Sequence, residues 1–150
     1  MTPINLIKAL ARALREELKG FKLSAEYQPD KKIRVYEQIM PQTHANDDTF
    51  FPNVVVYLVR IDEDGTDSIA TVNFSIEVYG GEDESGWQDL FNIAERIRQF
   101  VLTHPTIEKF PLAEGSYFAP VPPNEQPEPH FFFDCIVRYR IATPRVSIDI

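Results

Sequence analysis

The residues of this chain that could do chemistry are few and lie far apart. None of the three histidines, His44, His104 and His130, belongs to the His-x-x-x-His or Cys-x-x-Cys spacing that metals favour. His44 with Asp47 and Asp48 is the best candidate for a surface metal site, although an ordinary polar loop explains the same residues. We therefore expect no metal and no other cofactor.

The acidic run at residues 62–67 has the composition of a calcium loop but not its spacing. The twelve-residue calcium pattern needs glycine at position six and a bidentate Glu at position twelve. Counted from Asp62, these positions hold Asp67 and Asn73. The Asp-Gly pair at 64–65 tolerates positive φ, as a tight turn between strands requires. The run predicts a hairpin turn.

Nothing in the sequence marks a catalytic nucleophile. Cys135 lies on the apolar face of an alternating segment, which predicts a buried, inert thiol. The glycine pair at 80–81 precedes a helix, but the three acids that follow it would repel an anion. Glu77 and Asp134 could share one surface of a sheet, yet two carboxylates without a pocket do not make an active site. We expect no enzyme activity.

Apolar residues at three- and four-residue spacing predict a first helix over residues 3–19. Thr2 can cap its free N–H groups, Pro3 suits the first helical position, and Gly20 can end it. Its expected buried stripe is Ile7, Leu10, Ala11, Leu14 and Leu18.

A second helix is predicted to begin at Ser85, which has the spacing of a capping box with Gln88. It should end near Thr103, since Pro105 disfavours helical geometry in the residue before it. Its expected buried stripe is Trp87, Leu90, Phe91, Ala94, Ile97, Val101 and Leu102. Trp87 is most simply a core anchor, although a tryptophan can also lie at an interface.

Five segments are predicted to form strands: 33–39, 54–61, 68–79, 115–119 and 130–142. In the first, Ile33, Val35 and Ile39 share one face. Residues 54–61 are apolar on both faces, which predicts a central strand covered on both sides. Residues 68–79 alternate apolar and polar side chains, and with 54–61 they should form an antiparallel hairpin.

The order of these elements is helix, strand, strand, strand, helix, strand, strand. It predicts an α+β fold in which two helices pack on a mostly antiparallel four- to five-stranded sheet, as a single domain over residues 1–150. Residues 120–129 hold five of the twelve prolines and predict an extended connection. Residues 143–150 should be an exposed tail unless a neighbouring molecule captures them.

Composition excludes several classes of protein. Hydrophobic residues make up 43% of the chain and charged residues 25%, as in ordinary soluble globular proteins. No apolar run approaches the roughly 18 residues that cross a membrane, and we expect no secretory signal. The single cysteine excludes an internal disulfide and favours folding in the cytoplasm. A net charge of −8 argues against nucleic-acid binding, which needs clustered Lys and Arg.

The charge is spread unevenly along the chain. Residues 1–34 contain eight basic and four acidic residues, whereas residues 35–95 contain thirteen acidic residues and one basic residue, Arg60. Residues 96–150 balance six against six. One interpretation is that solvated faces simply differ in sign. The other is a molecule with a basic and an acidic side, which suits head-to-tail packing of copies.

Two strand motifs resemble those of the tail-terminator and related minor tail proteins of long-tailed bacteriophages. Residues 51–58, Phe-Pro-Asn-Val-Val-Val-Tyr-Leu, are similar to a recurring strand of that family. Residues 74–79, Phe-Ser-Ile-Glu-Val-Tyr, are similar to its apolar-Glu-Val-aromatic strand, and the aromatic strand from Phe131 to Ile141 also fits. The order of elements matches over most of the chain, but these motifs carry packing information and no chemistry.

The resemblance implies a structural subunit that forms a ring, commonly a hexamer. Such a ring caps the tail tube, ends its polymerisation and presents a surface to the head-side connector. The implied partners are further copies of the chain, the tail-tube protein and the head–tail connector protein. The implied place is the virion, at the tail or neck, after assembly in the cytoplasm of a bacterial host. The Pro-rich segment and the long tail depart from the family pattern.

A ring needs two different surfaces on each copy, and the opposite charges along the chain could supply them. We hypothesise that a basic set on one copy faces an acidic set on the next. These residues are Lys8, Arg12, Arg15 and Lys19 on one side and Asp62, Glu63, Asp64 and Asp67 on the other. Two alternatives stay open: a connector or tail-completion protein of the same neck region, and a small ligand-binding regulatory α+β domain, which would need an apolar pocket.

Overall fold

The structure, a computed structural model of the 150-residue chain, describes residues 2–21, 32–40, 52–79, 86–125 and 130–144. Its elements are α1 (Pro3–Glu17), β1 (Arg34–Glu37), β2 (Asn53–Glu63), β3 (Ser68–Tyr79), α2 (Gly86–Thr103), β4 (Thr106–Ile107), β5 (Phe110–Pro111), β6 (Tyr117–Pro120), a 3-10 turn (Pro123–Glu125) and β7 (His130–Ile141). Neither helix is long and apolar enough to cross a membrane.

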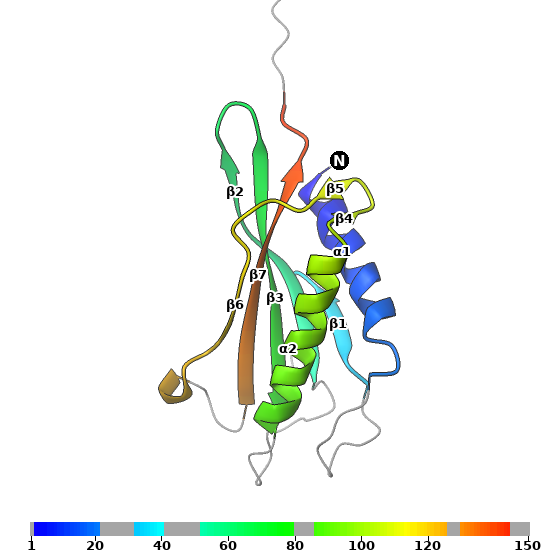
Figure 1. The fold of residues 1–150 in the computed structure, drawn as a ribbon, viewed down its shortest axis with the longest axis vertical. Coiled ribbons are helices and arrows are strands. Elements are labelled where there is room, and N and C mark those ends of the chain that lie inside the picture. Colours follow the sequence, from blue (N-terminus) through cyan, green and yellow to red (C-terminus); the bar gives the residue numbers. More distant parts are fainter. Residues whose placement is uncertain (1, 22–31, 41–51, 80–85, 126–129, 145–150) are drawn as a thin grey trace, which may run out of the picture.

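Five strands form one sheet in the order β1-β2-β3-β7-β6, and both helices lie on the same side of it (Figure 1). β1 pairs with β2 in parallel, and the other neighbours are antiparallel. α1 packs on β1 and β2, and α2 packs on β3 and β7. The predicted α+β fold with a mostly antiparallel sheet is confirmed. The small two-stranded sheet of β4 and β5 was not predicted, because its strands are too short to leave a pattern.

The start of α1 matches the prediction. Thr2 Oγ1 accepts a hydrogen bond from the backbone N–H of Asn5 at 3.3 Å, and the Thr2 N–H donates to Asn5 Oδ1 at 2.9 Å. This capping box satisfies N–H groups that the helix leaves without partners. All five predicted stripe residues are buried, and the helix ends at Glu17, two residues before the predicted end.

The buried stripe of α2 differs from the prediction. Trp87, Phe91 and Leu102 are 48%, 43% and 51% exposed, so their predicted burial is wrong. The side facing the sheet is Leu90, Ile93, Ala94, Ile97, Phe100 and Val101. At 3.6 residues per turn the three exposed residues fall on the edge of the apolar stripe, where the sheet does not enclose them. The predicted cap, Ser85, lies outside the described residues.

The prediction that the second strand is central holds only for its first half, and the prediction that both of its faces are covered is wrong, because Val55 and Tyr57 on the face away from the helices are only half-buried. β1 pairs with Asn53–Val56, but β2 continues to Glu63, past an irregularity between Leu58 and Arg60. Val59 and Ile61 are 47% and 38% exposed. The second half of β2 and the first half of β3 therefore form a hairpin arm that rises beyond the helices (Figure 1).

Two further strand predictions need correction. The predicted face of Ile33, Val35 and Ile39 breaks at its last member, because β1 ends at Glu37 and Gln38 turns the chain with a φ of 66°. Ile39 is 75% exposed as a result. The predicted strand at 115–119 is Tyr117–Pro120 on the edge of the sheet, a place that accepts proline.

The core fills the space between β3, its neighbours and the two helices. The largest side chains that are fully enclosed include Phe74, Leu10, Leu14, Ile76, Ile93 and Tyr139. The alternation predicted for 68–79 is confirmed: Val72, Phe74 and Ile76 face the helices. The opposite face of the same strand also holds buried residues, the polar side chains of Thr71, Asn73 and Glu77.

Replacing Tyr139 by phenylalanine is expected to raise the free energy of unfolding by about 1 kcal/mol. The Tyr139 hydroxyl is buried and has no hydrogen-bond partner among the described residues, and an unsatisfied buried hydroxyl costs about 1–3 kcal/mol. Urea denaturation of the two proteins measures the difference. A loss of stability in Tyr139→Phe would mean that the hydroxyl makes a favourable contact in solution.

Candidate assembly surfaces

The closest approach to a chemical site is a contact between Glu77 and His130. His130 Nδ1 lies 2.8 Å from Glu77 Oε2, and the His130 ring packs edge-on against Tyr79. Burial raises the pKa of Glu77 to about 7. No sequence pattern pairs Glu77 with His130, because the β3–β7 register, in which Tyr79 lies opposite His130, brings them together. Two groups can hold a proton here, but no third His, Cys, Asp or Glu joins them in the described part of the chain.

Asp134, which was expected to be able to share a sheet surface with Glu77, belongs to a different group of polar side chains. Asn73 Nδ2 donates to Asp134 Oδ1 at 3.0 Å and to the Tyr57 hydroxyl at 2.9 Å, and Asn73 Oδ1 accepts from the Cys135 N–H at 3.2 Å. The predicted burial of Cys135 is confirmed. Burial, and then the charge of Asp134, raise the pKa of its thiol. This arrangement satisfies buried polar atoms between three strands.

The other predicted candidates for chemistry do not converge. His104 Nδ1 lies 2.9 Å from the carbonyl oxygen of Phe100, and its ring packs on the Phe100 ring. His44, Asp47 and Asp48 lie outside the described residues.

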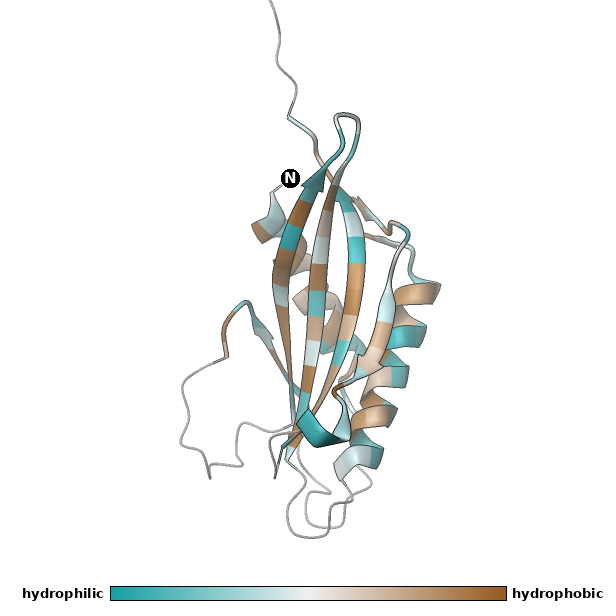
Figure 2. Cartoon of the chain, turned by 90° about the vertical axis from the view of Figure 1, so that its left-hand side faces the viewer, coloured by the Kyte–Doolittle hydropathy of each residue, from teal (hydrophilic) through white to brown (hydrophobic). Residues whose placement is uncertain are grey.

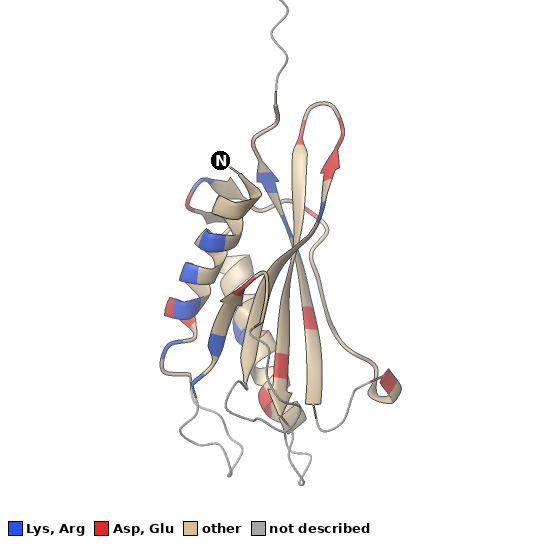
Figure 3. Cartoon of the chain, turned by 180° about the vertical axis from the view of Figure 1, so that it is seen from behind, with Lys and Arg blue, Asp and Glu red and all other residues tan. Residues whose placement is uncertain are grey.

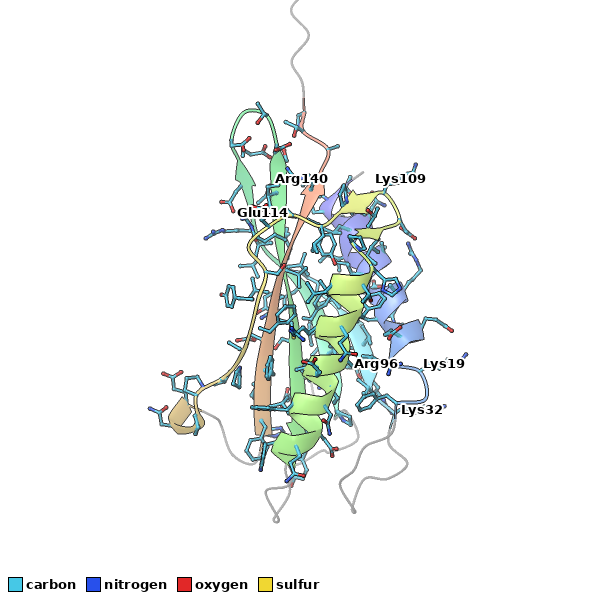
Figure 4. All side chains as sticks on the ribbon, in the orientation of Figure 1. Lys19, Lys32, Arg96, Lys109, Glu114 and Arg140 are labelled. Carbon is cyan, nitrogen blue, oxygen red and sulfur yellow. The ribbon has the colours of Figure 1, made fainter. Side chains whose placement is uncertain are left out.

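The predicted basic set lies along α1 and the turn that follows it: Lys8, Arg12, Arg15 and Lys19 (Figure 3). Lys8 and Arg15 approach the two oxygens of Glu37 at 3.3 and 3.4 Å. Burial alone would raise the pKa of Glu37, but these two cations outweigh it and hold the pKa below its ordinary value. Arg12 pairs with Glu108 at 2.9 Å, and Lys19 is exposed near the end of the helix (Figure 4).

The predicted acidic set lies at the tip of the hairpin arm: Asp62, Glu63, Asp64 and Asp67 (Figure 3). Asp64 shapes the turn by accepting hydrogen bonds from the N–H groups of Asp67 and Thr66 at 2.6 and 2.9 Å, which lower its pKa. Asp67 pairs with Arg140 at 2.8 Å. Asp62 lies 3.0 Å from Arg60 and 3.6 Å from Arg138.

The two sets are therefore separate in space, and most of their charges already have partners in the same chain. Exposed ion pairs of this kind contribute about 0–1 kcal/mol each. Replacing an ion pair within the chain by one to a neighbouring copy would change the free energy of association little. These charges can therefore orient the contact between copies more readily than they can stabilise it. Whether they face a neighbouring copy stays a prediction.

Exposed apolar side chains form two further surfaces. At the start of α2, the rings of Trp87 and Phe91 pack edge-on, and Phe91 packs edge-on against Phe133 of β7. We call these three residues the aromatic cluster. Away from this cluster, near the β1 and β2 end of the sheet, Ile4 at the start of α1 is 65% exposed, and Val59 and Ile61 are exposed on β2. Large apolar side chains in contact with water are typical of surfaces that bind other proteins.

The face of the sheet that points away from the helices is mixed in character. Figure 2 shows apolar and polar residues alternating along the strands, and because successive side chains point to opposite faces, this alternation separates the outward-facing residues from those that face the core. Tyr57, Phe132 and Ile136 lie on it, half-buried, around Asn73 and Asp134. No described helix covers it (Figure 3).

Comparisons with known proteins leave the family open. No model of a protein family matches the chain, and no curated protein matches its sequence. Among solved structures, a chain in the virion of a native gene transfer agent particle is similar to this one, with 15% identity over 93% of this chain and 98% of that chain and a TM-score of 0.38. At this level of similarity, function must be argued from the residues themselves.

Proposed function

We propose that this chain is a structural subunit of a bacteriophage-type tail, a tail terminator whose copies form a ring on the end of the tail tube. The ring ends polymerisation of the tube and provides the surface that joins the head-side connector. This proposal takes the chain to have no catalytic activity. The proposed partners are further copies, the tail-tube protein and the connector protein.

The observation that carries the proposal is that exposed apolar side chains lie on two separate surfaces. The aromatic cluster lies on α2 and β7, whereas Ile4, Val59 and Ile61 lie on α1 and the free part of β2. A ring requires each copy to offer two different surfaces, one to each neighbour, and neighbouring apolar side chains in contact with water are typical of such surfaces. The strand motifs at 51–58 and 74–79 support the choice of a tail protein.

Light scattering over a wide range of concentration, followed by electron microscopy with purified tail tubes, tests this function. Rings seated on tube ends are the expected result. A protein that stays monomeric and ignores the tubes would favour a connector or tail-completion role. Thermal stabilisation by a small metabolite would instead favour a ligand-binding domain.

Ring formation is expected to weaken as the salt concentration rises from roughly 0.05 to 1 M, because screening shortens the range of charge pairing to about 3 Å. Lys19→Glu should also raise the dissociation constant of the ring several-fold, since exposed pairs are worth up to about 1 kcal/mol. Sedimentation velocity measures both effects.

Lys109→Glu is the matched control for this charge reversal. Lys109 is exposed at the turn between β4 and β5, outside the basic set (Figure 4). The hypothesis of pairing between basic and acidic sets is wrong if rings ignore salt or if both variants behave alike.

A further inference from the structure

The second half of β2 has an open edge. β1 leaves β2 after pairing with Val56, and the Gln38 side chain then accepts a hydrogen bond from the Leu58 N–H at 3.1 Å. From Leu58 to Glu63, no strand in the described part of the chain pairs with β2 on that side. An open edge of this length offers backbone groups to an added strand, so proteins usually cover or block it.

An apolar groove continues from this edge in line with β1. Its floor consists of Pro3, Ile4, Ile7 and Leu58, with Lys8 and Glu37 at its rim, and its volume is about 410 Å³. Because β1 ends at Glu37, a strand added along β2 would extend the line of β1. Alternate side chains of that strand would then point towards α1 and lie over the groove.

The segment that follows β7 has the sequence pattern of such a strand. Residues 145–150 read Arg-Val-Ser-Ile-Asp-Ile, with Val146, Ile148 and Ile150 on one face and polar residues on the other. These residues lie outside the described part of the chain. Six residues of alternating pattern fit an edge that runs from Leu58 to Glu63.

We propose that residues 145–150 of one copy add to the open edge of β2 in the neighbouring copy, with Val146, Ile148 and Ile150 over the groove. This inference rests on the proposed ring and supplies its contact. The added strand would give main-chain hydrogen bonds to the edge and cover the exposed Ile4. Each copy then donates one segment and accepts another, as a closed ring requires.

The segment is too short to reach the groove of its own copy. The Thr143 hydroxyl lies 2.9 Å from the Ser68 hydroxyl, at the tip of the hairpin arm and on the side of β3 away from β2. Crossing the three strand spacings from β7 to the outer side of β2 takes about 14 Å, and returning along β2 to Leu58 takes about 17 Å more. The seven residues after Thr143 span at most about 25 Å, even without a turn. The accepting groove therefore belongs to another copy.

Charge favours an antiparallel orientation of the added strand. In that orientation Arg145 lies near Asp62 and Glu63 at the end of β2, and Asp149 lies near Leu58. A parallel strand would place Asp149 beside the same two acids. Like charges directly opposite in a sheet are destabilising, so the antiparallel pairing is preferred.

Disulfide trapping between two differently labelled proteins tests this contact. One protein carries Ile4→Cys, and the other carries Ile148→Cys. The native Cys135 is fully buried and stays outside the reaction. After mild oxidation of the mixed full-length chains, we expect a disulfide-linked dimer of the two proteins on a non-reducing gel. Ser147→Cys is the matched control, because it points away from the groove and should give much less dimer.

Substitution at the same two positions gives an independent measurement. Ile148→Glu should shift ring assembly to a concentration about tenfold higher or more, because it places a charge over an apolar groove. Ser147→Glu adds the same charge on the outer face and should leave assembly within about twofold.

The outcomes separate this inference from the proposed ring. Rings that form with wild-type protein, but without the dimer and with equal effects of Ile148→Glu and Ser147→Glu, would overturn the strand exchange and leave the terminator function standing. A disulfide only within one chain, in a protein carrying both cysteines, would overturn it as well. A wild-type protein that forms no ring with or without tail tubes would overturn both proposals.

Discussion

Phe74→Ala is expected to lower the free energy of unfolding by about 3–5 kcal/mol. Phe74 lies in the middle of β3, opposite Val56 on one side and Cys135 on the other, and its side chain is fully buried. Removing the ring leaves a cavity that neighbours on both strands and on α2 can fill only in part. A domain of this size is typically stable by about 5–15 kcal/mol, so the variant would be close to unfolding.

The measurement is urea or thermal denaturation followed by circular dichroism. Phe91→Ala is the matched control, because it removes the same ring from a helix position that is 43% exposed. We expect it to cost about 1 kcal/mol, the value of its ring contacts with Trp87 and Phe133. Equal losses in the two variants would contradict the placement of Phe74 at the centre of the core. Loss of assembly in Phe91→Ala without loss of stability would support a role of the aromatic cluster in binding.

Glu77→Gln is expected to remove a large part of the change in stability between pH 4.5 and pH 7. Burial raises the pKa of Glu77 from 4.5 to about 7, so the folded chain holds a proton that the unfolded chain has released. The stabilisation from this group is complete below about pH 4.5 and is lost as the pH rises through 7. The protonated Glu77 contributes at most about 3 kcal/mol to the free energy of unfolding. The contact with His130 lowers that limit, because an imidazole N–H stabilises the charged carboxylate.

Denaturation curves at a series of pH values measure this effect. The wild type should lose stability from pH 4.5 to pH 7 relative to Glu77→Gln, and the two curves should converge at acid pH. Glu114→Gln is the control, since Glu114 is exposed on the surface (Figure 4). If the wild type and Glu77→Gln respond equally to pH, the carboxyl group is hydrated in solution and its pKa is not raised.

Local pattern was enough to predict most of the elements and the fold class. Thr2, Pro3 and the stripe from Ile7 to Leu18 specify the first helix through contacts within a few residues, and the structure bears them out. The alternation across residues 68–79 specifies which side of β3 enters the core, because side chains point to opposite faces in turn. The acidic turn was also predicted correctly, since Asp64 and Gly65 satisfy it locally.

The errors lie where burial depends on a distant partner. Trp87 and Phe91 carry the same apolar signal as Leu90, but only the position of β7 decides which of them it covers. Val59 and Ile61 resemble core residues, and they are exposed because they lie on the hairpin arm that rises beyond the helices (Figure 1).

For the candidate surfaces, too, local patterns determine some features and tertiary contacts decide the others. The sequence by itself determined that charge and apolar residues alternate with the period of helix and strand, because these patterns act over a few neighbouring residues. Only the tertiary structure decided that Lys8 and Arg15 meet Glu37, that Glu77 meets His130, and that one edge of β2 stays open. These contacts join residues from 22 to 53 positions apart, and their geometry follows from sheet register and helix packing, which no local pattern records.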